Sequence, residues 1–496
     1  MKNIFKSIKI LVIFMLLASC SESYLDVNDD PNNPVTVSPD LVLPVALNYT
    51  ATIEERDRGQ NHLGNMFMAN WSQSDGFSWY NDEFLYLVTS SFYQRFFDYV
   101  YLNPLKQYQV LEDLEGDEFG YYKAIAKIMK SLHFQILVDC YGDIPYSEAL
   151  ERGGNPTPAY DDAQTVYEGL ITDLTAAIAL INATANNADI SPVAPGNDDG
   201  IFGGDMDMWK SFANTIKLRI LVRQSDMSGR AGYIQQEFNV IAAEGSGFMN
   251  SDVTINIGYN QTENQQNPKW NGFGQDVSGS NTLTNDATCA TPYILDKLMD
   301  TNDGRLNFFF EEPSGGHLGV VQGLQQYDEP IVDQYVPANV SNIGPGILKS
   351  PSQDAVIYTA AESYFNRAEA AMKGFISSSP QAMYEAGIQA SFSYLGAGDA
   401  TSYYSQNIPN VGWAASTNKM EAIISQKATA LMGVNALQSW FDYNRTGYPS
   451  NVPVSLLATT SDRPVRLFYP ASELTSNSDN VPSQSNAFSD KIFWAN

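Results

Sequence analysis

Long stretches of helical periodicity constrain the fold of this chain more than any other feature. The segments in which apolar residues recur at three- and four-residue spacing are 85–109, 121–138, 163–181, 209–223, 364–375 and 424–431. This spacing gives each helix one apolar face, which must be buried against a partner. We therefore predict a mainly α-helical chain built of stacked helix pairs. A regular 34-residue repeat is not visible, so any repeat is degenerate.

The chain changes character in its middle third, where Asn, Gln, Gly and Pro become frequent. This composition is typical of turns and loops. The short run 253–257 indicates a strand, and residues 291–299 indicate an isolated helix. The predicted division is a helical scaffold at 85–223 and 355–445, a loop-rich insertion with few short strands at 225–353, and an irregular tail after Thr446.

The N-terminus has the pattern of a secretory signal peptide. Three lysines precede an apolar run at residues 10–18, and the run ends in Leu17, Ala18, Ser19 and Cys20. The run is too short to span a bilayer, which needs about 20 apolar residues. A small-residue ending on cysteine resembles a bacterial lipoprotein signal, so residues 1–19 are expected to be removed and Cys20 to be lipidated. An ordinary secretory leader with an incidental cysteine is the alternative.

Residues 20–44 are predicted to form the lipid anchor and a polar tether. The segment from Ser21 to Pro44 is rich in Asp, Asn, Ser and Pro, which favours an extended lead-in. The folded body is predicted to be one domain at 45–496. No later stretch is long and apolar enough to cross a membrane.

The charge of the chain excludes one class of partner. The 28 basic and 56 acidic residues give −28, and removal of the three leader lysines gives −31. Such a charge repels nucleic acid, so no nucleic-acid partner is expected. Beyond Cys20 only Cys140 and Cys289 remain, and nothing in the sequence brings them together, so a disulfide is not expected.

Motifs of catalysis and of metal or cofactor binding are missing from the sequence. The three histidines have no zinc-type spacing, and no nucleophile elbow or phosphate-binding glycine loop occurs. Acidic pairs such as Asp161–Asp162 could serve glycoside hydrolysis, but with 56 acids such pairs arise by chance. We therefore predict a protein that is not an enzyme and that needs no cofactor or metal.

Two polar loops that carry aromatic residues are the strongest candidates for a ligand site. An aromatic ring can stack on the apolar face of a sugar, while amide and carboxylate groups bind its hydroxyls. Burial of the aromatic residues against the helical core is the alternative. The predicted ligand-binding residues are Trp71, Asp75, Trp79, Tyr80 and Asn81 in the first loop, and Trp270, Asn271 and Phe273 in the second.

Several longer strings of the sequence are distinctive. The string after Tyr24 reads Leu-Asp-Val-Asn-Asp-Asp-Pro-Asn-Asn-Pro, and another reads Asp139-Cys-Tyr-Gly-Asp-Ile-Pro. The full set of segments is 24–34, 139–150, 209–219, 302–305, 364–374, 426–432, 440–449 and 463–473. In these strings and in their order, along nearly its whole length, the chain resembles the SusD/RagB family of nutrient-binding outer-membrane lipoproteins. Arg367 and Glu369, within one of these strings, are expected to form ion pairs between helices.

The resemblance implies tetratricopeptide-like helix pairs and a loop-rich part that carries the ligand. It also implies a TonB-dependent, SusC-like transporter as partner and a lipid-anchored position on the outer membrane, facing the cell exterior. We accordingly expect a protein that captures oligosaccharides, or peptides, and delivers them to the transporter. The alternatives are a surface glycoside hydrolase and a structural lid of the transporter with little ligand affinity of its own.

Overall fold

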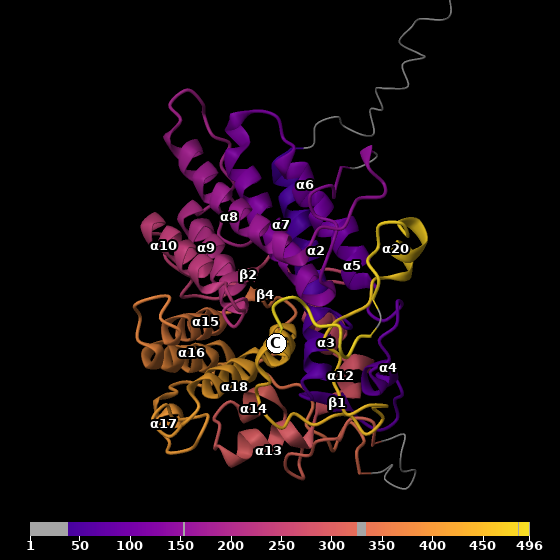
Figure 1. The fold of residues 1–496 in the computed structure, drawn as a ribbon. Helices are drawn as coiled ribbons and strands as arrows, with labels where there is room; N and C mark the ends of the chain where they lie inside the picture. Colours follow the sequence, from indigo (N-terminus) through magenta and orange to yellow (C-terminus); the bar gives the residue numbers. More distant parts are fainter. Residues whose placement is uncertain (1–37, 152–153, 325–333, 485, 496) are drawn as a thin grey trace, which may run out of the picture.

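The computed structural model describes residues 38–151, 154–324, 334–484 and 486–495. Within these residues the chain is mainly helical with a few short strands, as the sequence predicts (Figure 1). The predicted signal sequence and Cys20 lie outside the described residues.

The helices fall into two groups along the chain. The first comprises α2 (Pro39–Glu55), α3 (Gln60–Phe67), α4 (Asn81–Leu85), α5 (Arg95–Val100), the π-helix η2 (Tyr101–Leu105), α6 (Lys106–Glu112), the 3-10 helix η3 (Asp117–Phe119), α7 (Gly120–Tyr141), α8 (Ala163–Asn186), α9 (Met206–Arg223) and α10 (Ala231–Glu244). The second comprises α11 (Pro268–Phe273), α12 (Leu283–Ala287), α13 (Pro292–Asp300), α14 (Leu306–Phe309), α15 (Ala360–Met372), α16 (Pro380–Leu395), α17 (Thr401–Tyr404), α18 (Lys419–Leu431), α19 (Ala436–Thr446) and α20 (Ala471–Ser476).

Helix pairs form the scaffold. Helix α7 packs along α8, and α15 packs along α16 (Figure 1). Helix α8 is, among the described helices, the one long and apolar enough to cross a membrane. Its stripe of Val166, Leu170, Leu174, Ile178 and Ile181 is buried, so its apolar face belongs to the core.

Two small antiparallel sheets tie the loop-rich middle of the chain to the scaffold. Strand β1 (Trp71–Gln73) pairs with β3 (Thr288–Ala290), with Trp71 opposite Ala290. Strand β2 (Val253–Ile255) pairs with β4 (Ala355–Tyr358). Each sheet therefore joins segments that are far apart in the sequence.

Buried ion pairs connect the helices of the interior. Arg219 and Arg223 on α9 reach Glu362 (3.3 Å) and Asp139 (2.6 Å). The expectation for Glu369 is confirmed, because both of its oxygens accept hydrogen bonds from Arg445, at 2.7 and 2.8 Å. Arg367 differs from the expectation, since its guanidinium donates to the amide oxygen of Asn250 (2.7 Å).

Three local predictions differ from the structure. The periodic stretch 85–109 is not one helix, because residues 86–94 form a loop in which Tyr86 and Tyr93 have positive φ. Ala355 begins strand β4 and not a helix, since its segment completes a sheet with the distant β2. Helix α2 begins at Pro39, within the predicted polar tether, because proline suits the first helical position and an apolar run follows it.

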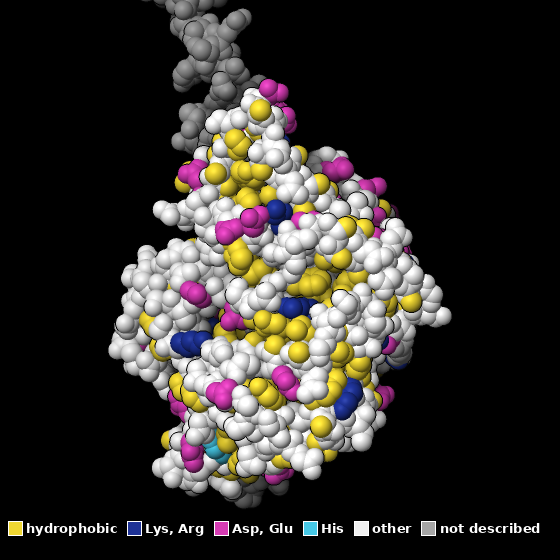
Figure 2. All heavy atoms as spheres, turned by 90° about the vertical axis from the view of Figure 1, so that its left-hand side faces the viewer, with side chains coloured by type: hydrophobic (Ala, Val, Ile, Leu, Met, Phe, Trp, Pro, Cys, Tyr) yellow, Lys and Arg dark blue, Asp and Glu magenta, His cyan; other side chains and the backbone are white. Residues whose placement is uncertain are grey.

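The C-terminal part of the chain packs into the first half. Gly64 on α3 lies against α19, where an added Cβ would sit 2.1 Å from the carbonyl carbon of Ala436. The indole of Trp494, which is fully buried, donates to Asp139 on α7 (2.9 Å). Figure 2 shows one face of the molecule, on which acidic side chains are dispersed and hydrophobic side chains gather over the centre.

Both remaining cysteines are free and buried, in line with the expectation of no disulfide. Burial raises the pKa of the Cys140 and Cys289 thiols, so both stay protonated.

Candidate functional site

The turn between α2 and α3 is the base of the candidate site. It contains Arg56, Asp57 and Arg58, and Arg58 has a positive φ of 52°. His62 on α3 fixes the turn, because its Nδ1 lies 2.9 Å from both the backbone nitrogen of Arg58 and Oδ1 of Asp57. Burial raises the pKa of Asp57, but the His62 hydrogen bond and the charges of His62 and Arg58 outweigh it and leave that pKa lowered. Asp57 therefore remains a carboxylate.

The loop that carries Trp79 is held over this turn by one side chain. Gln73, at the end of β1, accepts a hydrogen bond from the backbone nitrogen of Trp79 (2.7 Å) and donates to the carbonyl of Phe77 (2.5 Å). The Arg58 guanidinium donates to the Trp79 carbonyl at 2.9 Å. The Trp79 ring is partly exposed and meets Phe77 edge-on, with centroids 4.9 Å apart.

Trp79 and the turn enclose a cavity of 440 Å³, which we call the Trp79 cavity. Its lining consists of Arg56, Asp57, Arg58, Trp79, Asp82, Glu83, Ser91, Phe92, Tyr93, Gln94 and Arg95. Three arginines and three carboxylates balance one another there, in contrast to the strongly acidic chain as a whole. The cavity thus presents hydrogen-bond donors and acceptors in similar number beside an aromatic face.

Tyr93 and Glu83 form a fixed pair within the lining. The Tyr93 hydroxyl donates to Oε1 of Glu83 at 2.9 Å. Burial, followed by the charge of Glu83, raises the pKa of Tyr93 well above its usual range, so the phenol stays neutral. The hydrogen bond therefore fixes the orientation of the Glu83 side chain.

Three of the predicted binding residues are core residues. Trp71, Tyr80 and Phe273 are buried, with 1%, 0% and 0% of their surface exposed. Their rings surround His62, with ring centroids 6.0, 4.9 and 5.6 Å from it. A sugar ring does not reach them in this structure, because they support the turn from below. They therefore position the site and offer no stacking face.

The other predicted residues lie at or near the surface. Trp79 lines the cavity, and Asn81 begins the adjacent helix α4. Asp75 is partly exposed in the same loop, and its backbone nitrogen donates to the Tyr335 carbonyl (2.8 Å). Trp270 is partly exposed and Asn271 exposed, both on α11.

The two aromatic loops meet the same turn. The second loop reaches the turn at Gly272 on α11, where an added Cβ would lie 3.2 Å from the backbone nitrogen of Asp57. The first loop reaches it through Arg58, whose guanidinium donates to the Trp79 carbonyl. The sequence therefore identified both loops that flank the turn. It missed the charged lining of Arg56, Arg58 and Arg95, whose only sequence signal is the dense charge around residues 54–58.

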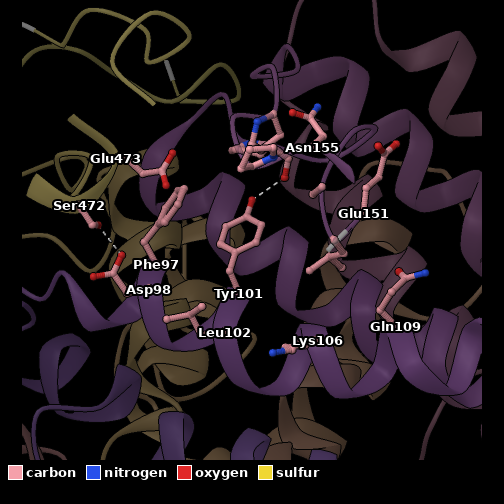
Figure 3. A pocket seen from close by; sticks show the side chains of 15 residues that line it. Phe97, Asp98, Tyr101, Leu102, Lys106, Gln109, Glu151, Asn155, Ser472 and Glu473 are labelled. Carbon is pink, nitrogen blue, oxygen red and sulfur yellow. Dashed lines mark hydrogen bonds between the residues drawn. The ribbon is translucent and has the colours of Figure 1, made fainter. Parts of the chain in front are cut away.

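A larger cavity of 670 Å³ lies along α5, η2 and α6 (Figure 3). The aromatic residues of its lining are Phe97, which is only 3% exposed, and Tyr101, which is partly exposed and whose hydroxyl donates to the Pro145 carbonyl at 2.5 Å. Leu102, at 66%, is an exposed aliphatic side chain of the lining. We take the Trp79 cavity as the candidate for a sugar, although it is smaller, because it places a partly exposed indole beside charged groups of both signs.

Comparison with known proteins decides the family. The family described as starch-binding and associating with the outer membrane, SusD-like, matches residues 31–470. The chain belongs to this SusD-like family. The SusD-like assignment agrees with the resemblance carried by the sequence strings, and the family description places its members at the outer membrane.

Solved structures share the fold of this SusD-like chain. A chitin-binding protein matches with a TM-score of 0.72 at 23% identity, covering 92% of this chain and 100% of its own. A chitin-binding SusD homologue from Flavobacterium johnsoniae gives 0.75 at 21% identity, covering 92% and 98%. A SusD homologue from Bacteroides uniformis gives 0.71 at 22% identity, covering 92% and 99%. None of the curated protein sequences matches this chain significantly.

Proposed function

We propose that this protein is a cell-surface lipoprotein that captures an oligosaccharide in the Trp79 cavity and delivers it to a TonB-dependent, SusC-like transporter. The observation that carries the proposal is a partly exposed indole on a cavity whose charges balance. The nutrient-binding role follows from the family, and the sugar, the site and the delivery step are our inference.

The lining suits a neutral, hydroxyl-rich ligand. The Trp79 ring can stack on the apolar face of a pyranose. Arginine side chains only donate hydrogen bonds and carboxylates only accept them, so Arg58 and Asp82 would bind different hydroxyls of one ring. A volume of 440 Å³ is within the range of small-ligand sites, roughly 300–1,000 Å³, and would hold one or two sugar units. Trp270 and Asn271, on the far side of the turn, would contact the next units of a chain.

The proposed delivery to a transporter is supported by where the protein is expected to lie in the cell. The lipoprotein-type signal ending in Cys20 and the family's association with the outer membrane both support an anchored protein beside a transporter. A peptide could also use aromatic and amide groups, and is the alternative ligand. We propose binding without catalysis, since the family is described as starch-binding.

Calorimetric titration with chitin and starch oligosaccharides tests the site. These sugars come first because structural neighbours bind chitin and the family description names starch. Trp79→Ala should weaken binding at least tenfold, about 1.4 kcal/mol, because the stacking face is lost. Trp270→Ala should weaken the longer oligosaccharides more than the shorter ones.

Trp413→Ala is the matched control, since Trp413 is also partly exposed but lies on another loop, against Tyr384. It should change affinity less than twofold. A confirmed sugar ligand whose affinity is unchanged by both Trp79→Ala and Trp270→Ala would refute the site. Release of shorter sugars from the titrated oligosaccharide would refute binding without catalysis.

A further inference from the structure

A second cavity lies where α13, α17 and α18 come together (Figure 1). Its cavity measures 290 Å³, and we call it the Lys297 cavity. The lining is supplied by residues on four segments: 293–303, 403–411, 421–426 and 449–451. None of these residues takes part in the Trp79 cavity.

Lys297 on α13 is the exceptional group of this lining. Its ammonium makes one long hydrogen bond, to the Ser425 carbonyl at 3.4 Å. Among the described residues, no carboxylate lies within ion-pair distance of it. The nearby Asp303 is already engaged by Arg305, which donates to its two oxygens at 2.9 and 2.6 Å. Lys297 therefore lines a cavity with a positive charge that the protein does not neutralise.

The surroundings depress the basicity of this amine. Burial lowers the pKa of Lys297 to about 8, and the charge of Arg305 adds to the effect, while that of Asp303 opposes it. Lys297 is partly buried, and a partly buried ammonium without a counterion carries a desolvation cost that an anion placed beside it would reduce. The cavity is thus prepared for a negatively charged group at one defined point.

The rest of the lining recognises hydroxyls and a ring. Tyr293 is partly exposed and supplies an aromatic surface, and the hydroxyl of Ser425 and the exposed amide of Asn451 supply polar contacts. Glu421 on α18 accepts a hydrogen bond from Ser450 at 2.7 Å, and can accept another from a ligand hydroxyl. Its charge also disfavours a second anionic group on the ligand.

We propose that the Lys297 cavity binds a sugar acid of monosaccharide size, such as a hexuronate, with the ligand carboxylate on the Lys297 ammonium. One anion, several hydroxyls and an apolar ring face match the Lys297 ammonium, which no described carboxylate pairs with, and the polar groups and tyrosine of this lining. A volume of 290 Å³ limits the occupant to about one sugar ring. The site is separate from the Trp79 cavity, so the inference stands or falls independently of the proposed oligosaccharide capture.

Titration of the full-length protein with sodium glucuronate tests the proposal, with glucose at matched ionic strength as the neutral probe. Glucuronate should bind at least fivefold more tightly than glucose. Lys297→Met should reduce glucuronate affinity at least tenfold, because the ammonium that would bind the ligand carboxylate is lost. Lys106→Met, which removes an exposed lysine on α6, should leave glucuronate affinity within twofold.

Glu421→Gln should change the glucuronate affinity in the opposite direction to Lys297→Met. It removes a negative charge from the cavity while keeping an acceptor for Ser450, so glucuronate should bind at least twofold more tightly. This variant keeps the test decisive even if Lys297→Met folds poorly. Equal affinity for glucuronate and glucose, full binding by Lys297→Met, or weaker binding by Glu421→Gln would each overturn the proposal.

Proton uptake supplies an independent readout. A bound carboxylate raises the pKa of Lys297, so binding at pH 8 should take up a fraction of a proton. Titrations in buffers of different ionisation enthalpy measure that fraction. It should vanish at pH 6, where the free amine is already protonated, and in Lys297→Met; uptake that persists in Lys297→Met would assign the proton to another group and overturn the proposal.

Discussion

Glu54 shows how the interior of this protein handles charge at a single residue. It lies on α2 with 2% of its surface exposed, and one end of the Gln60 carboxamide lies 2.7 and 3.1 Å from its two oxygens. Burial raises its pKa to about 8. The charge of Arg219 lowers this pKa, and the neighbouring Glu55 and Glu362 offset part of that lowering. The side chain is therefore a neutral acid at pH 7.

A pH dependence of stability follows from this pKa. The pKa of Glu54 is about 8 in the folded state against 4.5 ordinarily, so its contribution is fully present below pH 4.5 and is lost as pH rises to 8. The expected slope is roughly 1.4 kcal/mol per pH unit in that window. Glu54→Gln mimics the neutral acid, so it should match the wild type at pH 5 and exceed its free energy of unfolding at pH 8.5. Urea unfolding at the two pH values measures this, and a variant that is less stable than the wild type at pH 8.5 would contradict it.

The predicted binding residues show what sequence can say about single side chains. Composition located both aromatic loops, because clusters of aromatic and amide residues are visible in the sequence. It did not distinguish Trp79, which lines the cavity, from Trp71, Tyr80 and Phe273, which are buried around His62. That distinction depends on packing between segments about 200 residues apart, such as the hydrogen bond between the hydroxyls of Tyr80 and Thr288, which local pattern does not encode.

At the scale of elements, Gln73 is the link between strand β1 and the loop that presents Trp79. Gln73→Ala removes the side chain that accepts from the Trp79 backbone nitrogen and donates to the Phe77 carbonyl. Residues 77–80 should become more mobile as a result. We expect a several-fold faster dissociation of bound oligosaccharide and faster hydrogen exchange at Trp79. Gln73→Glu keeps the acceptor and loses the donor, so its effect should be intermediate. Hydrogen exchange that changes equally throughout the protein would instead indicate global destabilisation.

Helices with a continuous apolar stripe were predictable, and elements completed by distant partners were not. Helices α7, α8 and α9 cover predicted segments. Helix α8 buries one face, whereas α7 over 131–141 and α9 over 212–223 are buried on all sides. The loop at 86–94 interrupts an equally periodic stretch, since left-handed Tyr86 and Tyr93 break the helix there. Strand β4 was missed because its partner β2 lies about a hundred residues earlier.

At the scale of the whole molecule, anchoring and recognition should be separable. Cys20 lies before the described body, whereas the Trp79 cavity is built from residues 56–95. Cys20→Ala should move the protein from the membrane fraction to the soluble fraction after cell disruption, with oligosaccharide affinity unchanged within twofold. Retention of the variant in the membrane would show that Cys20 is not the anchor.

Two contacts described above affect when the chain can complete its fold. Helix α19 packs against Gly64, and the Trp494 indole donates to Asp139. Both contacts join the first third of the sequence to its last hundred residues, so loops of several hundred residues must close before they form. A chain emerging from a translocation channel therefore has an incomplete core until its final segments have crossed. For an exported protein this delay is useful, because the chain stays incompletely folded while it passes through the channel. It can complete its fold only on the far side of the membrane.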